Sequence, residues 1–524
     1  MRKEIKESNE QQKSKAWQQY EAGKAHKRRI GLYETVKANE AFYRGEQWQN
    51  GDGGNLPKPV FNVIRRVIDY LVCSVASADL SVRFSDENLP FADAEEKKLS
   101  SELIATLTDN TAYRWETEGM DAKLHRLLTD AAICGDGALY CYWDADKRGA
   151  GNYLGDIVTD IVDASCIFPA DVNRADVQSQ EYVILSGRAS VASLRAEAES
   201  CGVSAEDIKR IVRDDDASVS LGLGRYELDG EDEAKATFIV KFWREDGAVC
   251  FEKSTRDCVI KRAKTNCSLY PIAYFNWIPT KNSFHGTSPV SCMIPNQKFI
   301  NRAYAMAMKH MTDSAFSKVI YDKSKIPEWS NEVGEAIAAM GGGNVSDAVS
   351  VVGVGELHGE FMDFVDSAVT LTKELMGATE SALGNLEAKN TSAILALQET
   401  SRVTLDNIRY SFYKAIEDLA TIWADMICAY YPCDRLVPCK SDGKIDVRTV
   451  SPSQIKKALL VATVDVAEVT RYSAVNAQNM LDKLLDGGYI TPAEYLRRLP
   501  SGLLADRQAL IEDIEKRTAT AVVS

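Results

Sequence analysis

The feature that most constrains this chain is a long stretch, Thr391–Tyr431, that contains neither glycine nor proline and is followed by Pro432. Apolar residues recur along it at spacings of three and four, which is the periodicity of an amphipathic helix. They are Ile394, Leu397, Val403, Leu405, Ile408, Phe412, Ile416, Leu419, Trp423, Met426 and Tyr430. One unbroken helix of about 38 residues would be roughly 57 Å long at 1.5 Å per residue.

A helix of that length is too long to bury its whole apolar stripe inside one small domain. We expect it to cross between the layers of a large protein or to pack against neighbouring subunits. Two ordinary helices with a break near Thr400 and Ser401 fit the same pattern equally well, because most helices in globular proteins are much shorter. Both alternatives stay open from the sequence.

The length and net charge of the chain limit the number of domains and the kinds of partner that it can have. The chain has 524 residues, which is enough for about three domains. Its net charge of −14 argues against a protein that grips nucleic acid through a strongly basic surface. It is compatible with a protein past which DNA slides.

Cysteines and apolar runs indicate where the chain resides. It has 12 cysteines, but its first residues lack the apolar core of a secretory signal, so reduced and mostly buried thiols are expected. No apolar run approaches the ~18 residues that a membrane span needs. We therefore expect a protein assembled in the cytosol with no membrane partner.

Helical periodicity and strand-like runs alternate along the chain, which predicts an α+β fold that is mainly helical. Four strand-like runs follow an acidic, glycine-bearing segment and predict one compact β module. They are Thr237–Trp243, Ala248–Glu252, Asp257–Arg262 and Tyr270–Trp277.

The next helix is predicted over Ser288–Ala315, with Ser288 as its N-cap and Pro289 in its first turn. Lys298, Arg302 and Lys309 share one face of it, because offsets of four and eleven residues return to the same side of a helix. The favoured interpretation is a solvated face on which Asp313 pairs with Lys309. The functional alternative is a modest basic stripe facing a phosphate backbone.

An apolar, glycine-punctuated segment follows at Val351, Val352, Gly353, Val354 and Gly355. One interpretation is a buried strand. The other is a mobile loop without partners inside the subunit, exposed at the axis of a ring where it meets identical copies.

Motifs of catalysis are missing from the sequence. It contains no G-x-x-x-x-G-K-[ST] phosphate loop, no G-x-S-x-G elbow and no H-E-x-x-H pair. Cys250, Cys258, Cys267 and His285 could be drawn as a zinc site, but their spacings lack the C-x₂₋₄-C knuckle, and small buried thiols explain them better. We therefore predict no cofactor, no metal and no enzymatic activity.

Several short segments resemble the portal proteins of tailed bacteriophages, the head–tail connectors of the capsid. The similarity extends as an order of elements over roughly residues 30 to 510. The segments that carry it are Phe42–Trp48, Pro59–Leu71, His285–Val290 with Asn296–Asn301, and Leu383–Leu397.

The resemblance implies a homo-oligomeric, dodecameric ring around a double-stranded DNA channel at one vertex of the virion capsid, assembled in the host cytoplasm. It implies roles in genome packaging, retention and ejection. The implied partners are the terminase, the major capsid or scaffold protein, and the head-completion or tail-adaptor proteins. The alternative is another ring-forming phage connector without direct DNA contact, and an enzyme with an unrecognised active site ranks third.

The resemblance also implies a division into a wing, a stem, a β-rich clip and a helical crown. In this division Val349–Glu360 would be the tunnel loop, and the stripe from Ile394 to Tyr430 would serve wing and inter-subunit packing. The expected parts are an N-terminal arm at 1–30, wing at 31–213, an acidic segment leading into the stem at 214–236, clip at 237–285, stem helix at 286–320, connector and tunnel loop at 321–360, long helices and wing strands at 361–475, and crown at 476–524.

Overall fold

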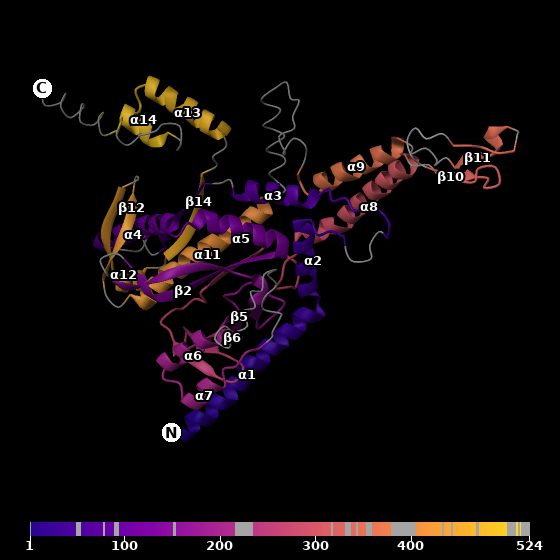
Figure 1. The fold of residues 1–524 in the computed structure, drawn as a ribbon. Coiled ribbons are helices and arrows are strands. Elements are labelled where there is room, and N and C mark those ends of the chain that lie inside the picture. Colours follow the sequence, from indigo (N-terminus) through magenta and orange to yellow (C-terminus); the bar gives the residue numbers. More distant parts are fainter. Residues whose placement is uncertain are drawn as a thin grey trace.

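A computed structural model shows an α+β protein (Figure 1). Within the described residues, no helix is both long enough and apolar enough to cross a membrane. The structure describes residues 2–48, 54–76, 79–87, 94–149, 153–214, 234–315, 318–330, 337–341, 344–352, 359–378, 405–431, 434–441, 444–458, 460–467, 471–499, 510–511 and 514.

Three helices open the chain, and strand β1 (Asp79–Asp86) separates them from two more. Gly45 ends the second of them in a left-handed conformation with φ of 96°, which favours glycine because it has no Cβ. The third helix buries one apolar face, from Ile64 to Val75. These helices are α1 (Arg2–Arg29), α2 (Leu32–Arg44), α3 (Val63–Ala76), α4 (Ala94–Thr117) and α5 (Met120–Cys134).

Two antiparallel sheets lie below α4 and α5 in Figure 1. The first has the order β3-β2-β9, from Leu154–Val162, Asp136–Arg148 and Ile272–Asn276. The second has the order β4-β5-β6-β7-β8. Its strands are Ile167–Pro169, Tyr182–Ser190, Lys235–Glu245, Ala248–Ser254 and Val259–Lys264.

The predicted compact β module is wrong in its grouping. The strands expected between Thr237 and Trp277 all form, but the last of them, β9, pairs with β2 in the other sheet. The first, β6, pairs with β5 as well as with β7. Periodicity locates strands but carries no information about which strands pair across the chain.

Helix α11 (Asp406–Tyr430) is the described part of the long glycine-free stretch. Its face from Phe412 to Ile427 is buried in the main core of the subunit. It packs against β9, β14 and β2, so the expectation that this stripe serves packing between subunits is wrong for these residues. Residues 379–404, which include Leu386–Ser392 and the possible break near Thr400, lie outside the described residues.

The remaining strands form two small antiparallel pairs beside α4 and α11. Strand β1 (Asp79–Asp86) pairs with β14 (Leu460–Ala467), and β12 (Arg435–Ser441) pairs with β13 (Lys444–Val450). Along the chain, the short helix α12 (Pro452–Lys457) lies between β13 and β14.

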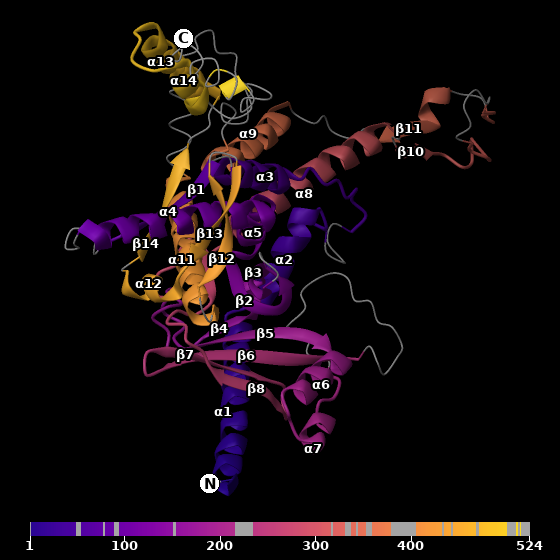
Figure 2. The same ribbon diagram turned by 90° about the vertical axis from the view of Figure 1, so that its left-hand side faces the viewer.

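Two helices, α13 (Arg471–Asp486) and α14 (Pro492–Arg498), form a separate group near the C-terminus (Figures 1 and 2). Thr491 caps the second of them. Its side chain accepts from the N–H of Glu494, whose own carboxylate accepts from the N–H of Thr491.

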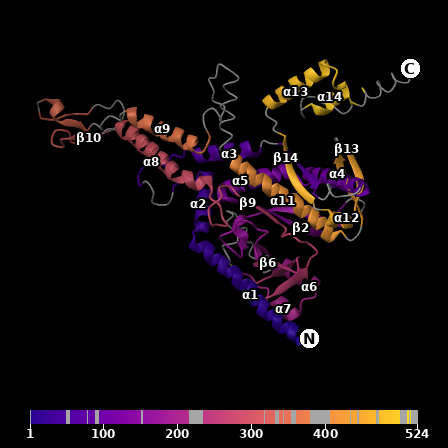
Figure 3. The ribbon, with the colours of Figure 1, turned by 180° about the vertical axis from the view of Figure 1, so that it is seen from behind.

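A long helical hairpin projects from the body (Figures 1 and 3). Helix α8 (Pro289–Ala315) leads outward and α9 (Gly359–Leu375) returns beside it. The far end carries an antiparallel strand pair, β10 (Lys318–Tyr321) and β11 (Val349–Val352), which we call the tip. The helix predicted over Ser288–Ala315 is therefore confirmed, and it forms one half of the projection.

The buried amide of Gln297 fixes the root of this hairpin. Its Oε1 accepts from the backbone N–H groups of Val63, at 3.0 Å, and Ile64, at 3.4 Å. Its Nε2 donates to the Phe61 carbonyl at 2.8 Å and to Asn301 Oδ1 at 2.9 Å. One side chain thus satisfies free N–H groups in the first turn of α3 and ties them to α8.

Replacement of Gln297 by alanine should lower the free energy of unfolding by roughly 2–4 kcal/mol, since each buried group left without a partner costs about 1–3 kcal/mol. Chemical denaturation monitored by circular dichroism would measure the loss. Asn296→Ala is the matched control, because Asn296 is exposed and makes one side-chain bond, to Thr372 Oγ1 at 3.2 Å. Equal stabilities of the two variants would contradict the anchoring role of Gln297.

Candidate assembly and channel surface

A tight polar junction sets the start of α8. The Oγ of Ser288 accepts from the N–H of Val290 at 3.0 Å and donates to the Ala132 carbonyl at 2.6 Å. Ser288 is thus the predicted cap, and it also fastens α8 to α5. Just before it, a Cβ on Gly286 would lie 2.9 Å from the carbonyl oxygens of Gly135 and Ile278, so only glycine fits this close approach.

His285 belongs to this junction and not to a metal site. Its Nδ1 lies 2.7 Å from Asp136 Oδ2, and the N–H of Gly286 donates to Asp136 Oδ1 at 2.6 Å. Burial lowers the pKa of His285, so the neutral ring donates to the carboxylate. No cluster of three or more side chains able to hold a metal occurs among the described residues, and Cys250, Cys258 and Cys267 are buried.

The three basic residues predicted on α8 do share one side of it. We call Lys298, Arg302 and Lys309 the basic stripe. Lys298 and Arg302 are exposed and Lys309 is half-buried. Residues that contact α9, such as Asn296 and Phe299, lie on other sides of the helix, so the basic stripe faces away from α9.

Contacts within the subunit account for part of the basic stripe. Lys309 Nζ lies 2.6 Å from Asp313 Oδ1, which is the pairing that the favoured interpretation of the sequence expected. Lys298 Nζ lies 5.6 Å from the centre of the Phe42 ring. Arg302, between them, is the member most open to solvent-borne phosphate.

An apolar strip runs along the projecting hairpin beside the basic stripe. On α9 the exposed members are separated by seven and four residues, which places them on one side of the helix. The Phe299 and Phe364 rings meet edge to face at 5.9 Å and join the two helices. The apolar strip consists of Phe299, Met306, Phe364, Leu371 and Leu375.

The apolar strip is exposed on a structure with little core of its own. Phe364, Leu371 and Leu375 have 62%, 54% and 66% of their surface accessible to solvent. Large apolar side chains aligned on one exposed face are characteristic of an interface rather than of scattered surface residues. Acidic residues border the strip on α9, at Glu360, Asp363 and Glu374.

Analysis of the sequence missed this strip, although its signal was present. The spacing from Phe364 through Leu371 to Leu375 is visible in the sequence, but it also fits an ordinary core-facing helix. Exposure can be assigned only once the projection is known.

The apolar segment predicted near Val351 lies at the tip. Val351 and Val352 belong to β11 and pair with Val319 and Lys318 of β10. The prediction of a loop without partners inside the subunit is therefore wrong for these two residues. Val351 is 60% exposed, so it is not a buried strand residue either, and Gly353, Val354 and Gly355 lie outside the described residues.

Comparison with known proteins bears on exactly this part of the molecule. No curated protein matches the chain significantly. Residues 254–472 match the sequence profile of the phage P22-like portal protein family. The matched residues include the junction at His285, both helices of the projection, the tip and α11.

The matched residues include His285–Val290 and Asn296–Asn301, two of the segments that resemble portal proteins, and these segments lie at the root of the projecting hairpin. The family is a structural component of the virion capsid. Residues 254–472 are therefore similar in sequence to the phage P22-like portal proteins.

Proposed function

We propose that copies of this chain form a closed, dodecameric ring around double-stranded DNA, with the α8–α9 hairpins side by side along the channel. The observation that carries the proposal is the apolar strip on a projection that has no core to hide it. The role is structural: the ring would guide the genome during packaging, retention and ejection, and another protein would supply the chemical energy.

Burial of the apolar strip would drive assembly. Full burial of one large apolar side chain contributes about 1.5–3 kcal/mol, so the five members of the strip provide a substantial driving force when repeated at every contact. A ring of identical copies uses two different faces of each subunit. We assign the apolar strip to one of these faces, against the neighbouring hairpin.

The basic stripe is assigned to the channel wall. It is modest, and the chain as a whole is acidic, with a net charge of −14. Each phosphate neutralised by a protein cation releases counterions and tightens binding. A few cations on an acidic ring would keep DNA centred without holding it, which suits a molecule that must move.

The acidic border of the apolar strip favours one alternative place for the basic stripe, at the contact between subunits instead of on the channel wall. Glu360, Asp363 and Glu374 lie on α9, and the basic stripe lies on the opposite side of α8. In a ring, the α9 of one copy could therefore meet the α8 of the next with complementary charge.

The projection changes the expected division of the chain. The resemblance assigned the clip to residues 237–285 and the tunnel loop to Val349–Glu360. We now assign the stem to α8 and α9 together, and the docking end to the tip. Ile320 and Met340 expose more than half of their surface there and would contact the terminase and later the head-completion or tail-adaptor proteins.

The remaining parts keep their expected roles as proposals. The body around α3, α4, α5 and α11 would be the wing, which contacts the major capsid or scaffold protein. The group of α13 and α14 would belong to the crown. Assembly in the host cytoplasm precedes incorporation into the virion.

The double change Phe364→Asp and Leu371→Asp should abolish ring formation, because two carboxylates per contact would have to be buried without partners. The subunit itself should remain folded, since both side chains are exposed in it. Mass photometry and negative-stain microscopy would report the oligomer, and circular dichroism the fold.

Ser367→Asp is the matched control for this pair. It adds a negative charge to an exposed position of the same helix outside the apolar strip, so rings should persist. Rings of normal size in the double variant would refute the assignment of the strip to the subunit interface.

The combined change of Lys298, Arg302 and Lys309 to alanine should leave ring assembly intact and weaken the salt dependence of DNA packaging. The reason is that a channel with fewer cations neutralises fewer phosphates, so that fewer counterions are released from the DNA as it passes. Packaging assays over a range of salt concentrations would measure the change, with Lys281→Ala, at an exposed position outside the hairpin, as the control. An unchanged packaging rate and salt slope would refute the channel role, and loss of the ring would assign the basic stripe to the subunit contact instead.

A further inference from the structure

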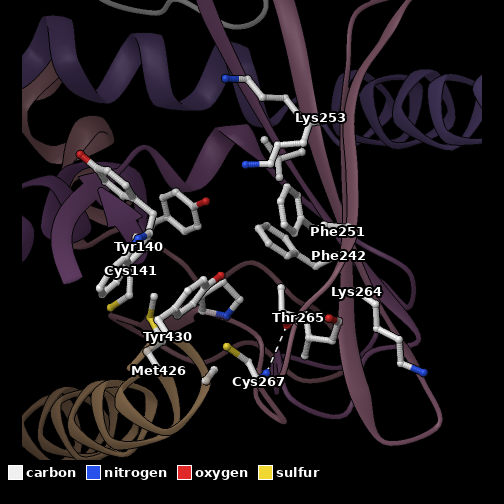
Figure 4. Close-up of a pocket in the computed structure, with 18 of the residues that line it drawn as sticks. Tyr140, Cys141, Phe242, Phe251, Lys253, Lys264, Thr265, Cys267, Met426 and Tyr430 are labelled. Atoms are coloured by element: carbon white, nitrogen blue, oxygen red, sulfur yellow. Dashed lines mark hydrogen bonds between the residues drawn. The ribbon is translucent and has the colours of Figure 1, made fainter. Parts of the chain in front are cut away.

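A second surface lies far from the projecting hairpin, in the body of the subunit. A groove of about 560 Å³ lies between the sheet of β6, β7 and β8 and the elements β2 and α11 (Figure 4). Its volume falls within the range of pockets that hold ligands or anchor side chains. None of the candidate assembly residues lines it.

The groove exists because the five-stranded sheet is only partly covered. One face of the sheet packs on α1 through Tyr20, Phe168 and Ile239, as Figure 2 illustrates. Helix α6 (Val191–Ser200) covers one end of the other face, where Leu194 packs near Ala236. Further along that face the sheet opens into the groove.

The floor of the groove is apolar and half-exposed. Phe238 and Val240 of β6 and Phe251 of β7 all face it, and each is half-buried. Phe242 and Phe251 lie opposite each other in the strand register, with ring centres 6.4 Å apart. Apolar side chains in this state are stabilised when another apolar group covers them.

Aromatic rings also form the opposite wall. Tyr140 of β2 and Tyr430 of α11 face the phenylalanines across the groove (Figure 4). The Tyr140 ring lies 6.1 Å from that of Phe242, and Tyr430 stacks on Trp143 at 5.2 Å. The wall is therefore rigid, which lowers the entropy lost when a ligand binds.

Lysines line the rim of this apolar groove. Lys253 Nζ lies 2.7 Å from Glu197 Oε2, and Lys264 Nζ lies 3.0 Å from Asp246 Oδ2. Lys261 is exposed and lies over the Phe251 ring at 5.7 Å. Because Lys253 and Lys264 already pair within the subunit, Lys261 is the rim cation that an added carboxylate would meet.

Backbone groups complete the surface. Among the described strands, β8 is the outermost of its sheet, and its Lys261 and Ala263 both line the groove. An outermost strand can pair with an added extended segment whose alternate side chains point to one face. A segment added there could place one side chain into the groove and the next ones beside the rim.

We propose that the groove binds an extended, acidic peptide segment of a partner protein, with a leucine or phenylalanine side chain inserted between Phe251 and Tyr140. Carboxylates on the flanking residues meet Lys261 and its neighbours on the rim. Nucleic acid fits less well, because a phosphate backbone needs several cations, whereas Lys253 and Lys264 already pair with carboxylates of the subunit.

Fluorescence anisotropy with the assembled full-length protein tests this proposal. The probe is a fluorescein-labelled ten-residue peptide of aspartate and glutamate with a central Leu-Phe pair. It should bind saturably, and the same peptide with Ala-Ala at its centre should bind at least roughly tenfold more weakly, since the groove then gains no apolar anchor. Equal binding of the two peptides would overturn the proposal.

Lys261→Glu should weaken binding of the Leu-Phe peptide by roughly tenfold, because it reverses the charge that meets the peptide. Arg262→Glu is the matched control: Arg262 is the next residue of β8 and lies over the Trp243 ring at 5.1 Å, and it does not line the groove. Full binding by the Lys261→Glu variant would overturn the proposal.

Two further arms exclude other occupants. A labelled oligothymidylate that bound the protein and displaced the Leu-Phe peptide would assign the groove to single-stranded nucleic acid and overturn the proposal. The peptide could also bind the dissociated subunit but not the assembled ring. This result would overturn the proposal as well, because a neighbouring copy would then occupy the groove.

Discussion

The projecting hairpin depends on one buried amide. Gln297 accepts from the first N–H groups of α3 and donates to the chain just before them and to Asn301. Asn301 in turn donates to Gln47 Oε1 at 2.7 Å. A helix that extends away from its domain has few apolar contacts at its outer end, so its direction is set by the bonds at its root. Here the bonds are polar, buried and directional, which fixes an angle better than apolar contact does.

The subunit has two candidate binding surfaces, one on the projecting hairpin and one in the body. The apolar strip from Phe299 to Leu375 lies on the projection, beside cations on one helix and carboxylates on the other. The groove near Phe251 lies in the body, between two sheets, with lysines on its rim. The first surface is long and suits a contact repeated between identical copies. The second is small and concave, and it suits one inserted side chain. Their separation would let the ring assemble without occupying the groove.

Local features of the chain were predictable from sequence, and long-range ones were not. The cap at Ser288 and the helix that it starts follow from short-range rules and appear as expected. The transfer of β9 to the sheet of β2 does not follow, because pairing depends on how the whole chain closes. The position of Val351 was not predicted for the same reason, because its partner Val319 is far from it in the sequence. The sequence does not mark Gln297 as an anchor, since a polar residue on a helix rarely reveals that it caps another helix.

The hairpin also has a mechanical consequence. About 14 residues of α8 lie beyond Asn301, which at 1.5 Å per residue gives an arm of roughly 21 Å. A rotation of about 5° at the root would therefore move the tip by roughly 2 Å, whereas the root itself would hardly move. The tip would thus amplify small changes in the wing. Pressure of packed DNA on the body of the subunit could be transmitted to the proteins bound at the tip without any rearrangement of the core.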